Sequence, residues 1–161
     1  MAKLQMDQNI KKQPKTADEY YNYAKSIFNC AEEYYRLISV ICTTCPNVFV
    51  QCTSATITNI AFSCELYLKS MLVLEKQSLE RGHSLDELYQ RLDNEDTKIR
   101  IRDNTKSTDF DLELKELGKS FEVSRYVYEY TEMACNVKFL TSLIDTLRSE
   151  CMTLLDDKRQ V

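Results

Sequence analysis

Hydrophobic residues along this chain recur mainly at steps of three and four, the spacing that places side chains on one face of an α-helix. The longest such pattern begins after residues 16–19, a capping box in which a threonine precedes a glutamate by three positions. Its first stripe is Tyr20, Ala24, Ile27, Ala31, Tyr34 and Ile38. A second stripe, Tyr21, Phe28 and Tyr35, recurs at steps of seven. This helix is therefore expected to contact two neighbours, or one neighbour and a dimer partner.

The next two helices are predicted from the same kind of pattern. One covers 48–77, after a turn at 43–47 that contains Pro46. Its buried stripe is Ile57, Ile60, Ala61, Cys64, Leu68, Met71 and Leu72. Gly82 is expected to act as a helix-terminating residue because glycine readily takes a positive φ. A second capping box at 84–87 predicts a short helix that ends near residue 92.

The second half of the chain predicts further helices separated by one long loop. Residues 93–109 are polar and of mixed charge and are expected to form that loop. A helix is predicted over 110–117, with a break at Gly118 and a continuation over 121–132. The last helix is expected over 136–157. Its buried stripe is Leu140, Leu143, Leu147, Cys151 and Leu154. The prediction is an all-α, up-and-down antiparallel bundle of four to five helices over residues 16–161, preceded by a disordered basic arm at 1–15.

Composition excludes several classes of protein. Two glycines and two prolines in 161 residues cannot supply the turns of a β-sandwich or a glycine-rich phosphate loop. The single histidine, His83, excludes a multi-histidine metal site, and no cofactor is expected. A net charge of −4 gives no bulk attraction to nucleic acid or to a membrane surface. The N-terminus lacks a secretory apolar segment, and no clean apolar run approaches the roughly 18 residues of a membrane span. We expect a cytoplasmic protein with no membrane partner.

Seven cysteines are a high and odd number for a chain of this size. Four fall at apolar helical positions and are expected to act as small buried hydrophobes: Cys30, Cys64, Cys135 and Cys151. Cys42 and Cys45 form a CxxC motif, but a zinc site needs a second pair or a nearby histidine. This motif is interpreted as two reduced thiols at a helix junction, with redox or metal chemistry as the alternative.

Three motifs appear in a fixed order. They are A-F-S-C-E-L-Y-L-K at 61–69, G-H-S-L-D-E-L at 82–88 and F-E-V-S-R-Y-V-Y-E at 121–129. Their order and spacing resemble the HEPN family (higher eukaryotes and prokaryotes nucleotide-binding domain), over about residues 17–157. The resemblance implies a helical bundle that forms a homodimer. It also implies binding of RNA or a nucleotide, metal-independent RNA cleavage in many members, and roles in toxin–antitoxin and phage-defence systems.

The cleaving members of that family carry an arginine followed four to six residues later by a histidine. Arg125 is present here, but no histidine follows it, and His83 precedes it by 42 positions. Metal-free cleavage needs a base for the ribose 2′-hydroxyl and a cation for the phosphate. If the protein is an enzyme, the resemblance thus implies a metal-independent endoribonuclease in which His83 and Arg125 meet in space.

The resemblance also implies a polar cleft. Its ligand-binding candidates are Glu65, Lys69, Arg125, Tyr128 and Glu129. Other interpretations of the same residues remain open. Glu65 and Lys69 can form an exposed ion pair at i,i+4 spacing, and Arg125 can pair with a nearby carboxylate. His83 can also pack at the start of the short helix, where it would have no chemical role.

The predicted function is therefore RNA or nucleotide binding by a homodimer of a bacterial antiviral defence or toxin–antitoxin system. The expected protein partner is a cognate antitoxin or another defence-system protein. The alternative is a HEPN scaffold without catalysis that binds a protein partner. Four basic residues can steer RNA or can belong to a solvated loop: Lys98, Arg100, Arg102 and Lys106.

Overall fold

The computed structural model describes residues 13–44, 53–125 and 136–159, with the backbone alone at 41–44, 53 and 119–125. Six helices lie in this part of the chain, and it contains no strand. They are α1 (Ala17–Thr44), α3 (Thr53–Lys76), α4 (Leu85–Gln90), α5 (Glu95–Asn104), α6 (Phe110–Arg125) and α7 (Val137–Arg159). The prediction of an all-α helical bundle is confirmed, but the described residues form six helices rather than four to five. Residues 1–12 of the predicted N-terminal arm and the CxxC residue Cys45 fall outside the described residues. The last three arm residues are described, and the Lys15 N–H donates to Glu19 Oε2 at 2.6 Å, so the expectation of disorder is wrong for residues 13–15.

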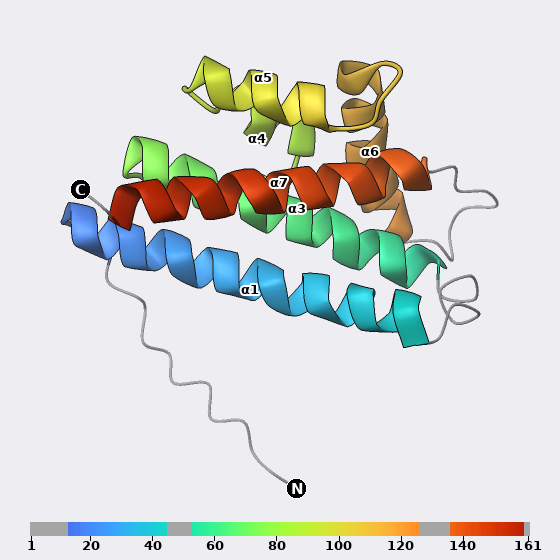
Figure 1. The fold of residues 1–161 in the computed structure, drawn as a ribbon, viewed down its shortest axis with the longest axis horizontal. Coiled ribbons are helices and arrows are strands. Elements are labelled where there is room, and N and C mark those ends of the chain that lie inside the picture. The colour runs from blue at the N-terminus through green and yellow to red at the C-terminus, as the bar shows by residue number, and fades with distance from the viewer. Residues whose placement is uncertain (1–12, 45–52, 126–135, 160–161) are drawn as a thin grey trace, which may run out of the picture.

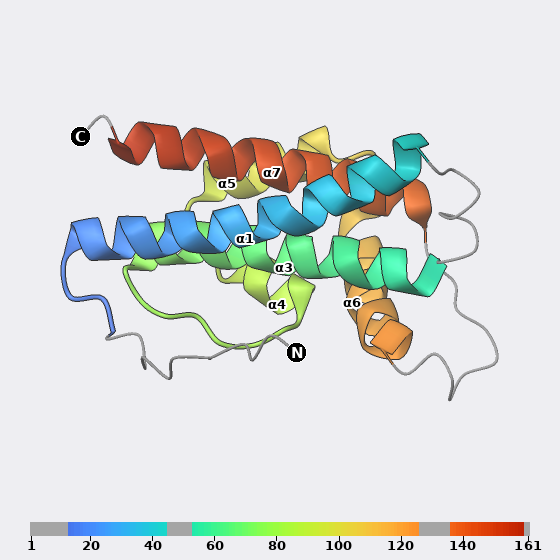
Figure 2. The ribbon, with the colours of Figure 1, turned by 90° about the horizontal axis from the view of Figure 1, so that it is seen from below.

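The three long helices α1, α3 and α7 lie side by side (Figures 1 and 2). α1 and α3 run in opposite directions, as short connections predict. α7 runs in the same direction as α3, because α4, α5 and α6 carry the chain back along the bundle before α7 begins (Figure 1). The start of α1 therefore meets the ends of both α3 and α7 at one end of the molecule.

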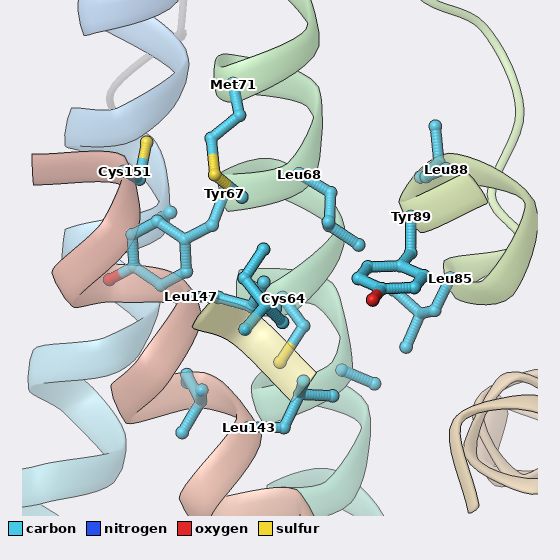
Figure 3. Close-up of a cluster of buried hydrophobic side chains, with 14 of the residues drawn as sticks. Cys64, Tyr67, Leu68, Met71, Leu85, Leu88, Tyr89, Leu143, Leu147 and Cys151 are labelled. Carbon is cyan, nitrogen blue, oxygen red and sulfur yellow. The ribbon is translucent and has the colours of Figure 1, made fainter. Parts of the chain in front are cut away.

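The central helix is α3, which contacts α1, α4, α6 and α7. Its side chains are buried on several faces, so Tyr67, Leu68 and Met71 are at most 1% exposed. Figure 3 shows Cys64 and Tyr67 facing α7, while Leu68 faces Leu85 and Tyr89 of α4. By length and composition, Ser54–Lys76 is apolar enough to cross a bilayer, but 72% of its most apolar window is buried inside the bundle.

Small side chains allow α1 and α3 to approach closely. Ala24 and Ala31 of α1 are fully buried against α3. The Ser70 hydroxyl donates to the Ala24 carbonyl at 2.8 Å, and the Ser63 hydroxyl donates to the Ala31 carbonyl at 3.3 Å. A hydroxyl can reach a carbonyl of the neighbouring helix only where no bulky side chain separates the two backbones. The first predicted stripe therefore forms a tight helix–helix contact.

The beginning of α1 follows the sequence prediction. The backbone N–H of Glu19 donates to Thr16 Oγ1 at 3.2 Å, and the backbone N–H of Thr16 donates to Glu19 Oε2 at 3.3 Å. The capping box is thus present in both directions. The second stripe finds its neighbour within the same chain, since the Tyr35 hydroxyl donates to Asp145 Oδ1 of α7 at 2.9 Å.

The predicted loop over 93–109 is wrong for most of its length, because residues Glu95–Asn104 form α5. Asn94 caps this helix by accepting a hydrogen bond from the Thr97 N–H at 3.2 Å. Only Thr97 and Ile101 of α5 are buried. A helix with two core positions among many charged residues has too little hydrophobic periodicity to be recognised from its sequence.

Two expected roles of glycine in ending helices also differ from the structure. α6 continues through Gly118, whose missing Cβ would lie 3.8 Å from Asp86 Oδ1, so this glycine packs against the start of α4. Gly82 does have a positive φ of 108°, but α3 ends earlier, at Lys76. The residue after Lys76 is Gln77, which has a left-handed φ of 48°.

The short helix α4 is confirmed, but its capping box is not. Ser84 is the N-cap residue and makes no side-chain cap hydrogen bond. Its hydroxyl donates instead to the side chain of Asp86.

Candidate functional site

Three of the candidate residues meet at one oxygen atom. The Lys69 ammonium donates to Glu65 Oε1 at 2.7 Å, and His83 Nδ1 lies 3.0 Å from the same oxygen. The Glu65 side chain is 1% exposed, that of Lys69 is 16% exposed and that of His83 is 69% exposed. The expectation of an exposed Glu65–Lys69 pair is therefore wrong, because the carboxylate lies inside the protein. We call these three residues the Glu65 cluster.

The fold positions the cluster from two separate segments. Glu65 and Lys69 are one turn apart on α3, which places both side chains on the same side of that helix. His83 belongs to the connection between α3 and α4. A hydrogen bond at 2.8 Å from Arg91 Nη1 to the Arg81 carbonyl holds this connection, and the positive φ of Gly82 turns the chain towards α4.

The arrangement orients the imidazole of His83. An ionised carboxylate can only accept, so a hydrogen bond in this contact requires the hydrogen to be on Nδ1. In a neutral ring of that tautomer the lone pair lies on Nε2, and the ring is mostly exposed. A buried carboxylate that holds one histidine nitrogen and leaves the other available is the arrangement that orients a histidine base or a phosphate ligand.

The cluster leaves one buried oxygen without a partner. Glu65 Oε2 has no hydrogen bond to any residue that the structure describes. An unsatisfied buried carboxylate oxygen has an energetic cost and is uncommon in folded proteins. The fold therefore accepts a cost in stability at this carboxylate.

Arg125 is the last residue of α6, which packs against α3 and α4. The backbone of Gly118, two turns earlier in α6, lies beside the backbone of Leu85 at the start of α4. α6 and the Glu65 cluster are therefore neighbours in the fold. Arg125 is described by its backbone alone, and Tyr128 and Glu129 lie outside the described part of the chain. The rest of the predicted cleft therefore stays a prediction.

The basic residues of the predicted loop are mostly held in ion pairs. Lys98 Nζ lies 2.9 Å from Glu95 Oε1. Arg100 Nε donates to Glu150 Oε2 at 2.9 Å, and Arg102 Nη2 donates to Asp111 Oδ1 at 3.1 Å. The first pair lies within α5, and the two arginine pairs link α5 to α7 and to α6. These three charges are therefore already engaged in contacts within the protein.

A buried charged network on the other side of α3 was not predicted. Glu32 of α1 accepts hydrogen bonds from Arg148 of α7 and, at 2.6 Å, from the Tyr67 hydroxyl of α3. Burial raises the pKa of Tyr67 strongly, and the neighbouring Glu32 carboxylate raises it further. Glu32 and Arg148 are 116 residues apart, so no local sequence signal could have paired them.

The cysteines fall into two groups. Cys64 and Cys151 are fully buried, as predicted, and burial raises the pKa of the Cys151 thiol to about 12. Cys30 is exposed, so its prediction as a buried hydrophobe is wrong. Cys42 is described by its backbone alone, and Cys135 lies outside the described residues. Over the ranges that the structure covers, no three His, Cys, Asp or Glu side chains gather as a metal site would require.

Comparison of the chain with protein-family models, with curated proteins and with solved structures gives no match.

Proposed function

We propose that this protein is a HEPN-like RNA- or nucleotide-binding protein of a bacterial defence or toxin–antitoxin system. The Glu65 cluster and Arg125 form its binding cleft. The observation that supports this proposal is the meeting of Lys69 and His83 on one oxygen of the buried Glu65 carboxylate. Two of the three ordered sequence motifs contribute to that contact, from segments separated along the chain.

The chemistry of the cluster suits a phosphate ester. His83 presents Nε2 in an exposed ring, and a neutral imidazole at this position can accept a proton from a ribose hydroxyl. Arg125 on the neighbouring helix supplies a guanidinium, whose planar fork matches two phosphate oxygens. In this proposal Glu65 orients His83 and does not contact RNA, because its carboxylate is buried.

Binding is tested with the full chain and a fluorescein-labelled single-stranded RNA of mixed sequence. We expect the affinity to fall as salt rises, because phosphate contacts release counterions. Arg125→Ala is expected to weaken binding by about tenfold, the size of one charge-assisted hydrogen bond. The matched control is Lys115→Gln, which removes an exposed charge from α6 and should leave binding unchanged. If the wild-type protein binds neither this RNA nor nucleotides at low salt, the proposal is wrong.

Cleavage is tested separately on the same RNA in the presence of EDTA. Activity that persists in EDTA and disappears in His83→Ala would assign the base to His83. RNA that binds and stays intact would restrict the protein to a binding role.

A second candidate function, a scaffold that binds a protein partner, is supported by α1. Leu37 is 50% exposed and Val40 is 56% exposed on this helix. Large apolar side chains at adjacent turns of a surface helix are common at protein interfaces. Light scattering of the wild-type protein and of Leu37→Glu tests this candidate, since loss of an oligomer in the variant would place an interface on α1.

A further inference from the structure

The end of the bundle where α1 begins and α3 and α7 finish holds a cavity of about 500 Å³. This volume lies within the range of small-ligand pockets, roughly 300–1,000 Å³. Tyr20 and Tyr21 supply aromatic rings, and Val73 and Leu74 supply a buried apolar floor. None of these features belongs to the Glu65 cluster.

Charged side chains stand at the edge of this cavity. Lys158 and Arg159, in the last turn of α7, line it together with Asp18 of α1. A smaller neighbouring cavity of about 150 Å³ shares Tyr21 and Arg159 with it and adds Lys25. Across the two cavities the cations outnumber the carboxylates by one, because Asp156 also lines the second. An apolar aromatic floor beside paired cations suits a ligand with a planar ring and an anionic group.

The backbone of Gln77 supports this assignment. Its N–H donates to the Val73 carbonyl at 3.0 Å, so Gln77 occupies the left-handed position that ends α3. Glycine is the usual residue there, because a side chain disfavours positive φ. Among the described residues Gln77 is the one non-glycine residue with such a φ, and it is one of the residues that line the cavity. A residue held in an uncommon backbone conformation beside a pocket supports a functional role there.

We propose that this cavity, the α1/α3/α7 end pocket, binds a small aromatic anion. The ring packs on Tyr20 and Tyr21, the anionic group pairs with Lys158 and Arg159, and the Gln77 amide bonds a polar edge of the ring. A nucleoside monophosphate and an aromatic carboxylate both have this chemistry. The pocket does not depend on the Glu65 cluster for any of these contacts.

The proposal is tested by titration calorimetry of the full chain with each probe in turn. The probes are AMP, GMP, CMP, UMP, benzoate and indole-3-acetate. Two half-ligand controls each carry one part of the chemistry, adenosine the ring without the anion and inorganic phosphate the anion without the ring. We expect at least one probe to bind with a Kd below about 1 mM and each half-ligand to bind less tightly. Binding by nucleotides alone, or by carboxylates alone, identifies the source of the ligand.

Two variants then locate the binding. Arg159→Gln is expected to weaken it by about tenfold. Gln77→Gly is expected to weaken it while the Tm stays the same or rises, which separates loss of a contact from loss of folding. Lys115→Gln and His83→Ala should bind the probe like the wild type. The proposal is overturned if no probe binds below about 1 mM, or if both pocket variants bind normally. Loss of probe binding in His83→Ala alone would place the ligand at the Glu65 cluster instead.

Discussion

Arg148 of α7 donates two hydrogen bonds to the Glu32 carboxylate of α1, from Nε to Oε1 at 2.6 Å and from Nη2 to Oε2 at 3.0 Å. The guanidinium also lies over the ring of Tyr35, 4.9 Å from its centroid. Because Tyr67 of α3 donates to the same carboxylate, this ion pair joins all three long helices. It thus connects α7 to α1 as well as to α3.

Removing Arg148 should destabilise the protein strongly. The Glu32 side chain is 10% exposed, and its carboxylate loses both guanidinium bonds in Arg148→Met. We expect the free energy of unfolding to fall by about 3 kcal/mol, as for other buried ion pairs that lose one partner. Urea unfolding followed by circular dichroism measures this change. Lys25→Met is the control, because Lys25 is exposed on α1, and a similar loss in that variant would contradict the prediction.

The same network should make stability depend on acid pH. Burial raises the pKa of Glu32, but hydrogen bonds from Arg148 and Tyr67 outweigh burial and hold this pKa below its usual value of 4.5. A carboxylate whose pKa falls on folding contributes stability above the pKa of the unfolded chain and loses it as the pH drops through the folded pKa.

The measurement is urea unfolding of the wild type and Glu32→Gln from about pH 7 to about pH 3. The stability difference between them should be largest near neutral pH and should shrink below about pH 4.5. Glu33→Gln, an exposed neighbour, should show no such trend. A difference that stays constant with pH would mean that Glu32 has an ordinary pKa in the folded protein.

The contact between α1 and α3 should not tolerate larger side chains. Ala31 is fully buried where the Ser63 hydroxyl reaches its carbonyl. Ala31→Leu is expected to lower the free energy of unfolding by about 1–3 kcal/mol through overpacking. Asn29→Leu, at an exposed position of the same helix, controls for helix propensity and should change stability little. Thermal unfolding measures the Tm of both variants. Equal Tm values would show that the α1–α3 contact has room for a larger side chain, which would contradict the prediction.

The attachment of α5 should depend on a single apolar side chain. Ile101 is fully buried, whereas Ile99, two positions earlier, is 54% exposed. Ile101→Ala is expected to cost about 2–4 kcal/mol, and Ile99→Ala less than about 0.5 kcal/mol. Hydrogen exchange of the α5 amides should accelerate in the first variant only. Equal protection in both variants would show that ion pairs, rather than Ile101, hold this helix.

The Glu65 cluster should respond unequally to loss of its two partners. Lys69→Met leaves a carboxylate that is 1% exposed without its ammonium and should cost about 3 kcal/mol. His83→Ala removes a ring that is 69% exposed and should cost less than about 1 kcal/mol. Adding Glu65→Gln to Lys69→Met should restore part of the stability, because the buried charge is then absent. Chemical denaturation that shows no such recovery would exclude an ionised Glu65.

Local patterns were sufficient for the long helices. The box at Thr16 and Glu19 begins α1 as predicted, and the stripe through Ala24 and Ala31 is the face that α3 covers. These features depend on residues within a few positions of one another, where spacing along the chain determines the spatial neighbours. The pairing of Glu65 with Lys69 could also be predicted from the sequence, because i,i+4 residues share a helix face.

Other features were decided by distant contacts. α5 is held on the bundle by two buried side chains, Thr97 and Ile101. α6 continues through Gly118, where α4 packs against it. The burial of Glu65 and its contact with His83 depend on how the chain returns after α3. The sequence alone determined an all-helical chain and its long amphipathic faces, since these follow from short-range periodicity. Only the tertiary structure decided which charged side chains are buried and which residues they pair with. The reason is that contacts between distant segments exclude water from these side chains and bring their partners together.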